Sequence, residues 1–309
     1  MNALKNRLDA YEQLLRLHQP TGALLLLWPT LSALWLATGG QPPLSLVIVF
    51  VMGTLLMRSA ACALGDWVDR DSGGGNGNDA DCHDPDTRAG PLKRGVITPW
   101  EVLAVATVLT LIAFCFVWFT TYIAIGIAAA ALALALLLAL SQPFFRRFFS
   151  LPQALLGVAF LFGIPIAFAA ANNTVPWYAW GLMGIHVFWV VACDIGDAMA
   201  SRERDIERGC RSSALILGRY DVLATAVCYG LYLAGMIGAG LWWRLGIAYW
   251  VALALAAIGA ACGLWFVRNR ESSRCSAVFR HNHWIVMVVF IGIAADYTLR
   301  LHAWPILGR

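Results

Sequence analysis

Acidic residues gather in two segments of this 309-residue chain, where their carboxylates could bind a divalent metal ion. The chain has 18 acidic residues, and these segments hold Asp66, Asp69, Asp71, Asp79, Asp81, Asp84 and Asp86, then Asp194, Asp197, Glu203, Asp205 and Glu207. Clustered carboxylates repel one another unless cations lie between them. Mg²⁺ usually binds carboxylates together with substrate phosphates, and the interleaved Arg and Lys residues suit phosphate oxygens. The pattern therefore indicates magnesium-dependent chemistry on a phosphorylated substrate.

The spacing within each segment supports a shared ligand. Asp66 and Asp69 are three residues apart, on one face of a helix. Asp194, Asp197, Ser201 and Asp205 fall at offsets 0, 3, 7 and 11, which places them within about 60° of one another around a helix. Each segment can therefore direct two or more oxygens toward one point. Solvated loop charge is the alternative, and the residues alone leave both open.

Arg58 lies inside an apolar stretch, two helical turns before Asp66. An arginine within a membrane is costly and usually faces a cavity with a partner. Its position predicts a functional cation near the first acidic segment. Snorkelling of the side chain to the membrane surface is the alternative.

The elements that position these residues are predicted to be membrane helices. The chain is 60% hydrophobic and 13% charged, whereas a soluble domain is about 45–50% apolar and about 25% charged. A spanning helix needs about 20 apolar residues. Six windows contain no Asp, Glu, Lys or Arg: 17–57, 102–145, 148–193, 222–243, 245–267 and 281–295. Composition therefore excludes a soluble globular enzyme and a disordered chain.

The windows predict an all-α, multi-pass protein with nine transmembrane helices in one bundle. Each of the first three windows is long enough for two spans. Gly39-Gly40 with Pro42-Pro43 divides the first, and Asn172-Asn173 with Pro176 divides the third. The fourth and fifth windows hold one span each, and the last span continues past Asp296 to about residue 301.

The basic residues predict the orientation. Of the 22 Lys and Arg residues, 18 lie before the first helix or in the even-numbered connections, and the odd-numbered connections hold only Arg244. The positive-inside rule therefore places the N-terminus in the cytoplasm and the C-terminus outside. Residues 1–19 have apolar side chains at helical spacing between charges, which is typical of a cytoplasmic interfacial helix. No basic patch with interleaved aromatic residues appears, so nucleic acid is not an expected partner.

At these residues the chain closely resembles the 4-hydroxybenzoate polyprenyltransferases, a group within the UbiA-type intramembrane prenyltransferases. The resemblance runs from about residue 16 to 297 and is carried by RLHQPTGALLLLWPTLSALWLA (16–37), MRSAAC (57–62), LPQALLGVAFLFGIPIAFAA (151–170), the segment 193–218 ending in RSSALILG, and FRHNHWIVMVVFIGIAADY (279–297). It implies one nine-helix domain over residues 1–309 in the bacterial inner membrane. Residues 66–99 and 194–220 would form its cytoplasmic active-site loops.

The first acidic motif of that family is altered here. NDxxDxxxD reads GDWVDRDSG at 65–73, so Asp66 and Asp69 match while Gly65 and Gly73 replace an Asn and an Asp. The insert SGGGNGNDA (72–80) is followed by Asp81, near the family's final Asp when the alignment is counted back from residues 87–92. We expect Asp81 to replace the missing carboxylate through a glycine-rich hinge. A disordered insert is the alternative.

The second motif is altered further. Asp194 matches, but Cys193 replaces a Tyr, and Ser201 and Arg204 stand where acids are expected. Asp197 lies one turn from both Asp194 and Ser201 and could compensate. Gly90 replaces an Arg, and His18-Gln19 replace an Asp-Lys pair.

The resemblance implies a role for each group of residues. Mg²⁺ would be bound by Asp66, Asp69, Asp81, Asp194, Asp197 and Asp205, with Asp66, Asp69, Asp194 and Asp205 as catalytic residues. The diphosphate of a polyprenyl donor would be bound by Arg70, Lys93, Arg94, Arg202 and Arg211. Arg58 is the candidate for the carboxylate of 4-hydroxybenzoate, in ubiquinone synthesis. A different acceptor, or a non-catalytic lipid-binding or scaffold protein, remains open because of the altered motifs. A transporter is weaker, because the acids lie at one membrane face rather than at the midplane.

Asp81 provides the first test. Membranes containing the chain, labelled 4-hydroxybenzoate and a polyprenyl diphosphate should yield product with Mg²⁺ and none with a chelator. The Asp66→Ala and Asp81→Ala variants should both lose that product, because each removes a metal ligand. Product that survives in Asp81→Ala would reject the displaced carboxylate and leave the enzyme assignment standing.

Overall fold

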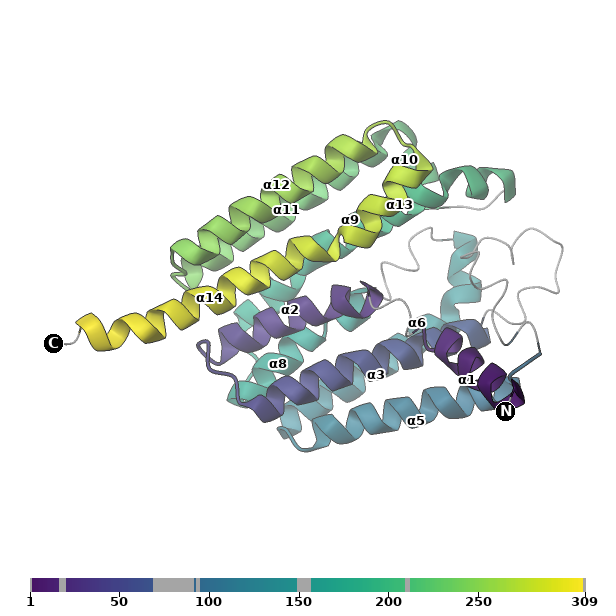
Figure 1. Cartoon of the computed structure of the whole chain (residues 1–309), viewed down its shortest axis with the longest axis horizontal. Coiled ribbons are helices and arrows are strands. Elements are labelled where there is room, and N and C mark those ends of the chain that lie inside the picture. Colours follow the sequence, from purple (N-terminus) through teal and green to yellow (C-terminus); the bar gives the residue numbers. More distant parts are fainter. Residues whose placement is uncertain are drawn as a thin grey trace.

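The computed structural model describes residues 2–16, 21–68, 92, 95–148, 157–208 and 212–307, and in these ranges it contains helices and no strands (Figure 1). In chain order the elements are α1 (Asn2–Leu14), α2 (Thr21–Ala37), α3 (Leu44–Val68), α5 (Pro99–Trp118), α6 (Tyr122–Phe148), α8 (Gly163–Asn172), α9 (Trp177–Arg208), α10 (Ser213–Leu217), the 3-10 turn η2 (Gly218–Tyr220), α11 (Asp221–Trp242), α12 (Ile247–Val267), α13 (Ser272–His281) and α14 (His283–Leu307). The all-α prediction is confirmed.

The predicted breaks between helices lie where the sequence placed them. Gly39 and Gly40 have φ angles of 61° and 86° and separate α2 from α3. Asn173, with φ 53°, ends α8 in the left-handed conformation that commonly terminates helices. The Asn172 side chain donates to the Ala37 carbonyl at 3.1 Å, so the two breaks meet at one end of the bundle.

Six helical segments are long and apolar enough to cross a membrane in the described part of the chain: 44–68, 99–118, 177–203, 213–242, 247–267 and 272–300. Three shorter apolar helices cover 22–37, 122–138 and 157–172. The nine predicted spans correspond to these nine segments in order. By length and composition, six of these segments could cross a membrane.

Two helices continue beyond the charge-free windows and carry the acidic segments. α3 runs through Arg58 and Asp66, and α9 runs through Asp194 to Arg208. A continuing helix satisfies its own backbone hydrogen bonds while its charged side chains reach water. In Figure 1 these ends of α3 and α9 point toward the end of the bundle that holds the N-terminus, and the C-terminus lies at the opposite end. The 194–208 part of the predicted active-site loop is therefore helical.

The main core surrounds α9, which packs against α2, α8, α10, α11 and α13. Trp189 of α9, Tyr232 of α11 and Tyr249 of α12 are among its largest fully buried side chains. Phe290 of α14 stacks on Trp28 of α2, with ring centroids 5.5 Å apart. α2 contacts both α3 and α9, so it lies between the two helices that carry acids.

A second, smaller core holds the N-terminal helix in place. Ala10 and Leu14 of α1 are buried with Ala63 of α3 and Val102 of α5. Tyr11 donates a hydrogen bond of 3.4 Å to Glu101 of α5. The predicted interfacial helix is therefore packed against the ends of two membrane helices.

Close packing of α12 on α14 depends on Gly292. A Cβ atom at this position would collide with the Cβ of Ala252 and lie 3.3 Å from the Cα of Tyr249. Gly292→Ala should lower the free energy of unfolding by about 1–3 kcal/mol, because the backbones must separate. Thermal unfolding in detergent measures this. Gly238→Ala on α11 is the control, since nothing lies within 4 Å of the added methyl, and equal Tm values for both variants would contradict the packing argument.

Candidate functional site

The first acidic segment is paired with the end of the N-terminal helix. Asp66 lies in the last turn of α3, and its side chain is 14% exposed. The Nη2 atom of Arg16 lies 3.9 Å from Asp66 Oδ1. Arg16 lies two residues after the end of α1 and has a positive φ of 49°. A cation therefore already lies beside the carboxylate that is predicted to bind metal.

Arg58 lies two turns before Asp66 on α3, against the start of α2. A Cβ atom added at Gly22 would lie 2.6 Å from Nη2 and 2.8 Å from Nε of Arg58. The guanidinium therefore occupies the space that a side chain at residue 22 would fill. The positive charge of Arg16 acts on Arg58, and Arg16 also lies beside Asp66.

The second acidic segment lies on the C-terminal part of α9. Asp194 and Asp197 are partly exposed, whereas Asp205 is 6% exposed. Ser201 Oγ donates to Asp205 Oδ2 at 3.0 Å, so the serine that replaces an expected acid supports an acid one turn further along the helix. Asn282 donates to the sulfur of Cys193 at 2.7 Å and accepts a 2.8 Å hydrogen bond from Tyr229. The two replaced positions thus have partners within the fold.

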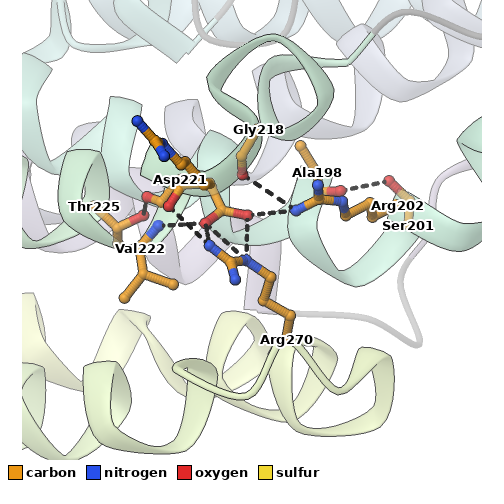
Figure 2. Close-up of polar contacts among 9 residues, drawn as sticks. Ala198, Ser201, Arg202, Gly218, Asp221, Val222, Thr225 and Arg270 are labelled. Carbon is orange, nitrogen blue, oxygen red and sulfur yellow. Dashed lines mark hydrogen bonds and ion pairs between the residues drawn. The ribbon is translucent and has the colours of Figure 1, made fainter.

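A buried carboxylate holds the end of α9 (Figure 2). Asp221, at the start of α11, is fully buried and lies between two guanidinium groups. Arg202 Nη1 lies 2.7 Å from Oδ2, and Arg270 Nη2 lies 2.7 Å from Oδ1. The Val222 N–H donates to Oδ1 at 2.7 Å. The helix N-terminus adds a favourable field for the negative charge.

The same arginines also bind backbone carbonyls. Arg202 donates to Gly218 O at 3.3 Å, and Arg270 donates to Arg219 O at 2.9 Å. Ser272 Oγ donates to Ala200 O at 2.5 Å. These contacts join α9, η2, α11 and the connection between α12 and α13, and they set the direction of the acidic end of α9.

Hydrogen bonds to Asp221 raise the pKa of Arg270 above its ordinary value. A cation with a raised folded-state pKa stabilises the fold below its unfolded-state pKa and loses that contribution only as pH rises through the folded value. For arginine, that loss would begin only at strongly alkaline pH. Arg270 therefore keeps its positive charge at every physiological pH.

Sequence reasoning placed Arg202 on the diphosphate and missed Asp221 and Arg270. In the structure Arg202 contacts Asp221, and its contact with diphosphate stays a prediction. A signal was present: Asp221 is a lone acid directly before the charge-free window 222–243, where it is poised to cap a helix. Nothing local in the sequence indicates that the arginine 49 residues later would reach it.

The structure does not complete a metal site from the residues it describes. In that part of the chain no three Asp, Glu, His or Cys side chains are close enough to bind one ion. The predicted ligands Asp69 and Asp81, and the predicted diphosphate contacts Arg70, Lys93, Arg94 and Arg211, lie outside the described residues.

The described donors nevertheless fit Mg²⁺ in chemistry. Asp66, Asp194 and Asp197 provide carboxylate oxygens, the ligands that Mg²⁺ prefers, and Mg²⁺ needs only a few of them when substrate phosphates supply the others. The guanidinium beside Asp66 shows that this carboxylate accommodates a cation.

Comparison with known proteins reveals full-length similarity. The model of the UbiA prenyltransferase family matches residues 26–288. A protein named 4-hydroxybenzoate octaprenyltransferase, from Cupriavidus necator (strain ATCC 17699), is 47% identical over 298 residues, which cover 95% of this chain and 99% of that protein. A protein of the same name from Janthinobacterium sp. (strain Marseille) is 46% identical over 303 residues, or 96% and 100% of the two chains.

Solved structures share the fold at lower identity. The apo structure of a UbiA homolog from Aeropyrum pernix K1 aligns with a TM-score of 0.69 at 20% identity, over 88% of this chain and 97% of that one. A UbiA homolog from Archaeoglobus fulgidus bound to GPP and Mg²⁺ aligns with a TM-score of 0.66 at 13% identity, over 92% and 99%. The arrangement of helices is therefore one already known.

Replacing Asp221 tests the role of the buried ion pair. Asp221→Asn should lower the free energy of unfolding by about 3 kcal/mol, because two arginines lose a buried counter-ion. Glu271→Gln is the matched control, since Glu271 pairs with Arg274 at 2.6 Å with both side chains about half exposed, and such pairs contribute about 0–1 kcal/mol. Denaturant or thermal unfolding in detergent distinguishes them. Similar losses in both variants would contradict the assignment.

Proposed function

Since this chain belongs to the UbiA prenyltransferase family, we propose that it transfers a polyprenyl group from polyprenyl diphosphate to 4-hydroxybenzoate. The group is attached to the ring carbon ortho to the hydroxyl, a step of ubiquinone biosynthesis. The observation that carries this proposal is the nearly full-length similarity to enzymes named for that reaction, at 43–47% identity. Their names make octaprenyl diphosphate the first donor to test.

The two acidic segments hold the metal and the donor's diphosphate. Mg²⁺ is bound by Asp66, Asp69, Asp81, Asp194, Asp197 and Asp205, with Asp66, Asp69, Asp194 and Asp205 as the catalytic carboxylates. When bound, the metal neutralises the charge that develops on the diphosphate leaving group. Arg70, Lys93, Arg94 and Arg211 contact the diphosphate oxygens, since arginine and lysine are suited to phosphate. The contact between Arg202 and Asp221 favours a positioning role for Arg202.

The apolar bundle protects the reacting carbon. The allylic C–O bond breaks and its electron pair leaves with diphosphate; the ring carbon then forms the new C–C bond and loses its proton, which restores aromaticity. Side chains of the main core keep water from the allylic cation. Water that reached it would yield a prenyl alcohol instead of the product.

Arg58 binds the carboxylate of the acceptor. Its guanidinium lies against the start of α2, in the room that the absence of a side chain at Gly22 leaves. Asp66 and Arg58 lie on the same helix, so the acceptor and the metal end of the site are linked by α3. A planar guanidinium can bind a carboxylate through two parallel hydrogen bonds.

All nine apolar segments cross the membrane in this proposal, with the N-terminus in the cytoplasm and the C-terminus outside. The positive-inside distribution supports this orientation. The acidic ends of α3 and α9 lie toward the same end of the bundle (Figure 1), which is the cytoplasmic end. The host membrane is the bacterial inner membrane, consistent with the bacterial relatives.

Two alternatives follow from the altered motifs. Replacement of expected groups by Cys193, Ser201 and Arg204 allows a family enzyme with another acceptor, or a non-catalytic lipid-binding or scaffold protein. Membranes containing the chain should be supplied with octaprenyl diphosphate and labelled 4-hydroxybenzoate, with Mg²⁺ or a chelator. Metal-dependent prenylated 4-hydroxybenzoate supports the proposal. Turnover of only another phenol supports a different acceptor, and no product with any phenol, from folded protein, supports the scaffold.

Gly22 tests the acceptor site separately. Gly22→Ala should displace the Arg58 guanidinium while sparing the fold, because only the end of a flexible side chain must move. We expect the KM for 4-hydroxybenzoate to rise about three- to tenfold, the scale of a weakened charge-assisted hydrogen bond, with the KM for prenyl diphosphate unchanged. Gly53→Ala on α3, the helix that carries Arg58, is the control, since the added methyl meets open space. An unchanged acceptor KM would remove Arg58 from this role.

A further inference from the structure

Arg16 reaches the metal end of the site from an element outside the apolar segments. It follows α1, and its Nη2 atom lies 3.9 Å from Asp66 Oδ1. Its side chain is 24% exposed and that of Asp66 is 14% exposed. The pair is therefore largely shielded but open enough for the arginine to change partner.

The backbone at Arg16 indicates a purpose for this side chain. Arg16 has φ 49°, a left-handed conformation in which Gly or Asn is usual at the end of a helix. Its N–H closes the turn by donating to Gln13 O at 3.1 Å. Glycine would adopt this conformation with less strain but would leave no cation beside Asp66. Strained residues of this kind concentrate at functional sites.

The helix that carries Arg16 is held firmly. Leu14 of α1 is fully buried in the small core with α3 and α5. Arg7 and Tyr11 both contact Glu101 of α5, at 3.5 and 3.4 Å. Arg16 is therefore presented to Asp66 by a packed element rather than by a loose terminus.

The local charge balance shows what Arg16 can do. Arg16 lies beside the negative charge of Asp66 and also acts electrostatically on Arg58. A divalent cation that approaches Asp66 must compete with the Arg16 guanidinium for the carboxylate. A diphosphate group, in contrast, attracts that guanidinium.

From this geometry we propose that Arg16 neutralises the charge of Asp66 before substrate binds. When substrate binds, the Arg16 side chain leaves Asp66 and pairs with the diphosphate group. The proposal rests on the proposed function. In the substrate-free protein the Arg16 guanidinium weakens the binding of Mg²⁺ alone to Asp66. It also makes the binding of metal and the binding of diphosphate depend on each other. A residue with only a structural role would not affect these two ligands in opposite directions.

The test measures binding to the full-length protein in detergent as well as turnover in membranes. Arg16→Gly keeps the left-handed backbone and removes the guanidinium. We expect its Kd for MgCl2 alone, by titration calorimetry, to fall about threefold or more, because a competing cation is gone. Its Kd for inorganic pyrophosphate with Mg²⁺, and its KM for prenyl diphosphate, should rise about tenfold, because a charge-assisted contact is lost.

A second variant and two controls complete the design. Arg16→Lys keeps the charge, so it should retain the weak binding of Mg²⁺ alone and restore part of the pyrophosphate affinity; it also serves if Arg16→Gly does not fold. Arg7→Gln removes another α1 arginine, whose partner is Glu101. Arg244→Gly removes a left-handed arginine, φ 51°, from another helix end. Both controls should bind both ligands as wild type does.

The outcomes separate this proposal from the proposed function. Unchanged or weaker binding of Mg²⁺ alone in Arg16→Gly, or unchanged pyrophosphate binding, would overturn the role of Arg16 even if wild type makes product. Opposite shifts in the two affinities would support it even if 4-hydroxybenzoate is not the acceptor. Absence of product from wild type with every acceptor bears on the proposed function alone.

Discussion

The end of this bundle that carries the acidic part of α9 depends on the buried carboxylate of Asp221. Burial of a carboxylate is costly unless hydrogen bonds and opposite charges replace its water. Asp221 meets that requirement through Arg202, Arg270 and the Val222 N–H. Because each arginine also binds a backbone carbonyl, the carboxylate brings four segments of chain to one place. The acidic end of α9 is oriented by this cluster.

Two ion pairs with the same components serve different purposes in this bundle. Arg16 and Arg270 both have left-handed backbones, and each lies beside an aspartate. Asp221 is fully buried and makes contacts of 2.7 Å with both arginines, whereas Asp66 is partly exposed and lies 3.9 Å from Arg16. Strong, saturated contacts resist exchange, and longer, partly solvated ones permit it. The ion pairs of Asp221 therefore suit a structural role, whereas the pair of Asp66 with Arg16 suits an exchange of partner.

Two replacement residues of the second acidic motif, Cys193 and Ser201, have partners within the fold. Ser201 donates to Asp205, and Cys193 receives a hydrogen bond from Asn282, which Tyr229 also contacts. Polar groups that are satisfied in this way carry little penalty on burial. Loss of a family carboxylate therefore affects ligand binding more than folding, which is why similarity of fold extends over nearly the whole chain.

The sequence by itself determined the helical class, the apolar segments and their breaks. Hydrocarbon excludes charge and requires internally satisfied backbone, so windows without charge become helices, and residues such as Gly39, Gly40 and Asn173 end them. The sequence also placed Asp194, Asp197 and Asp205 on one helix face, because helical periodicity is local. Only the tertiary structure decided the partners of the charges: Asp221 with Arg270, Asp66 with Arg16, and Arg202 with Asp221. Each of these pairs joins residues 19 to 50 positions apart, and packing of helices selects among many arginines that a sequence pattern cannot distinguish.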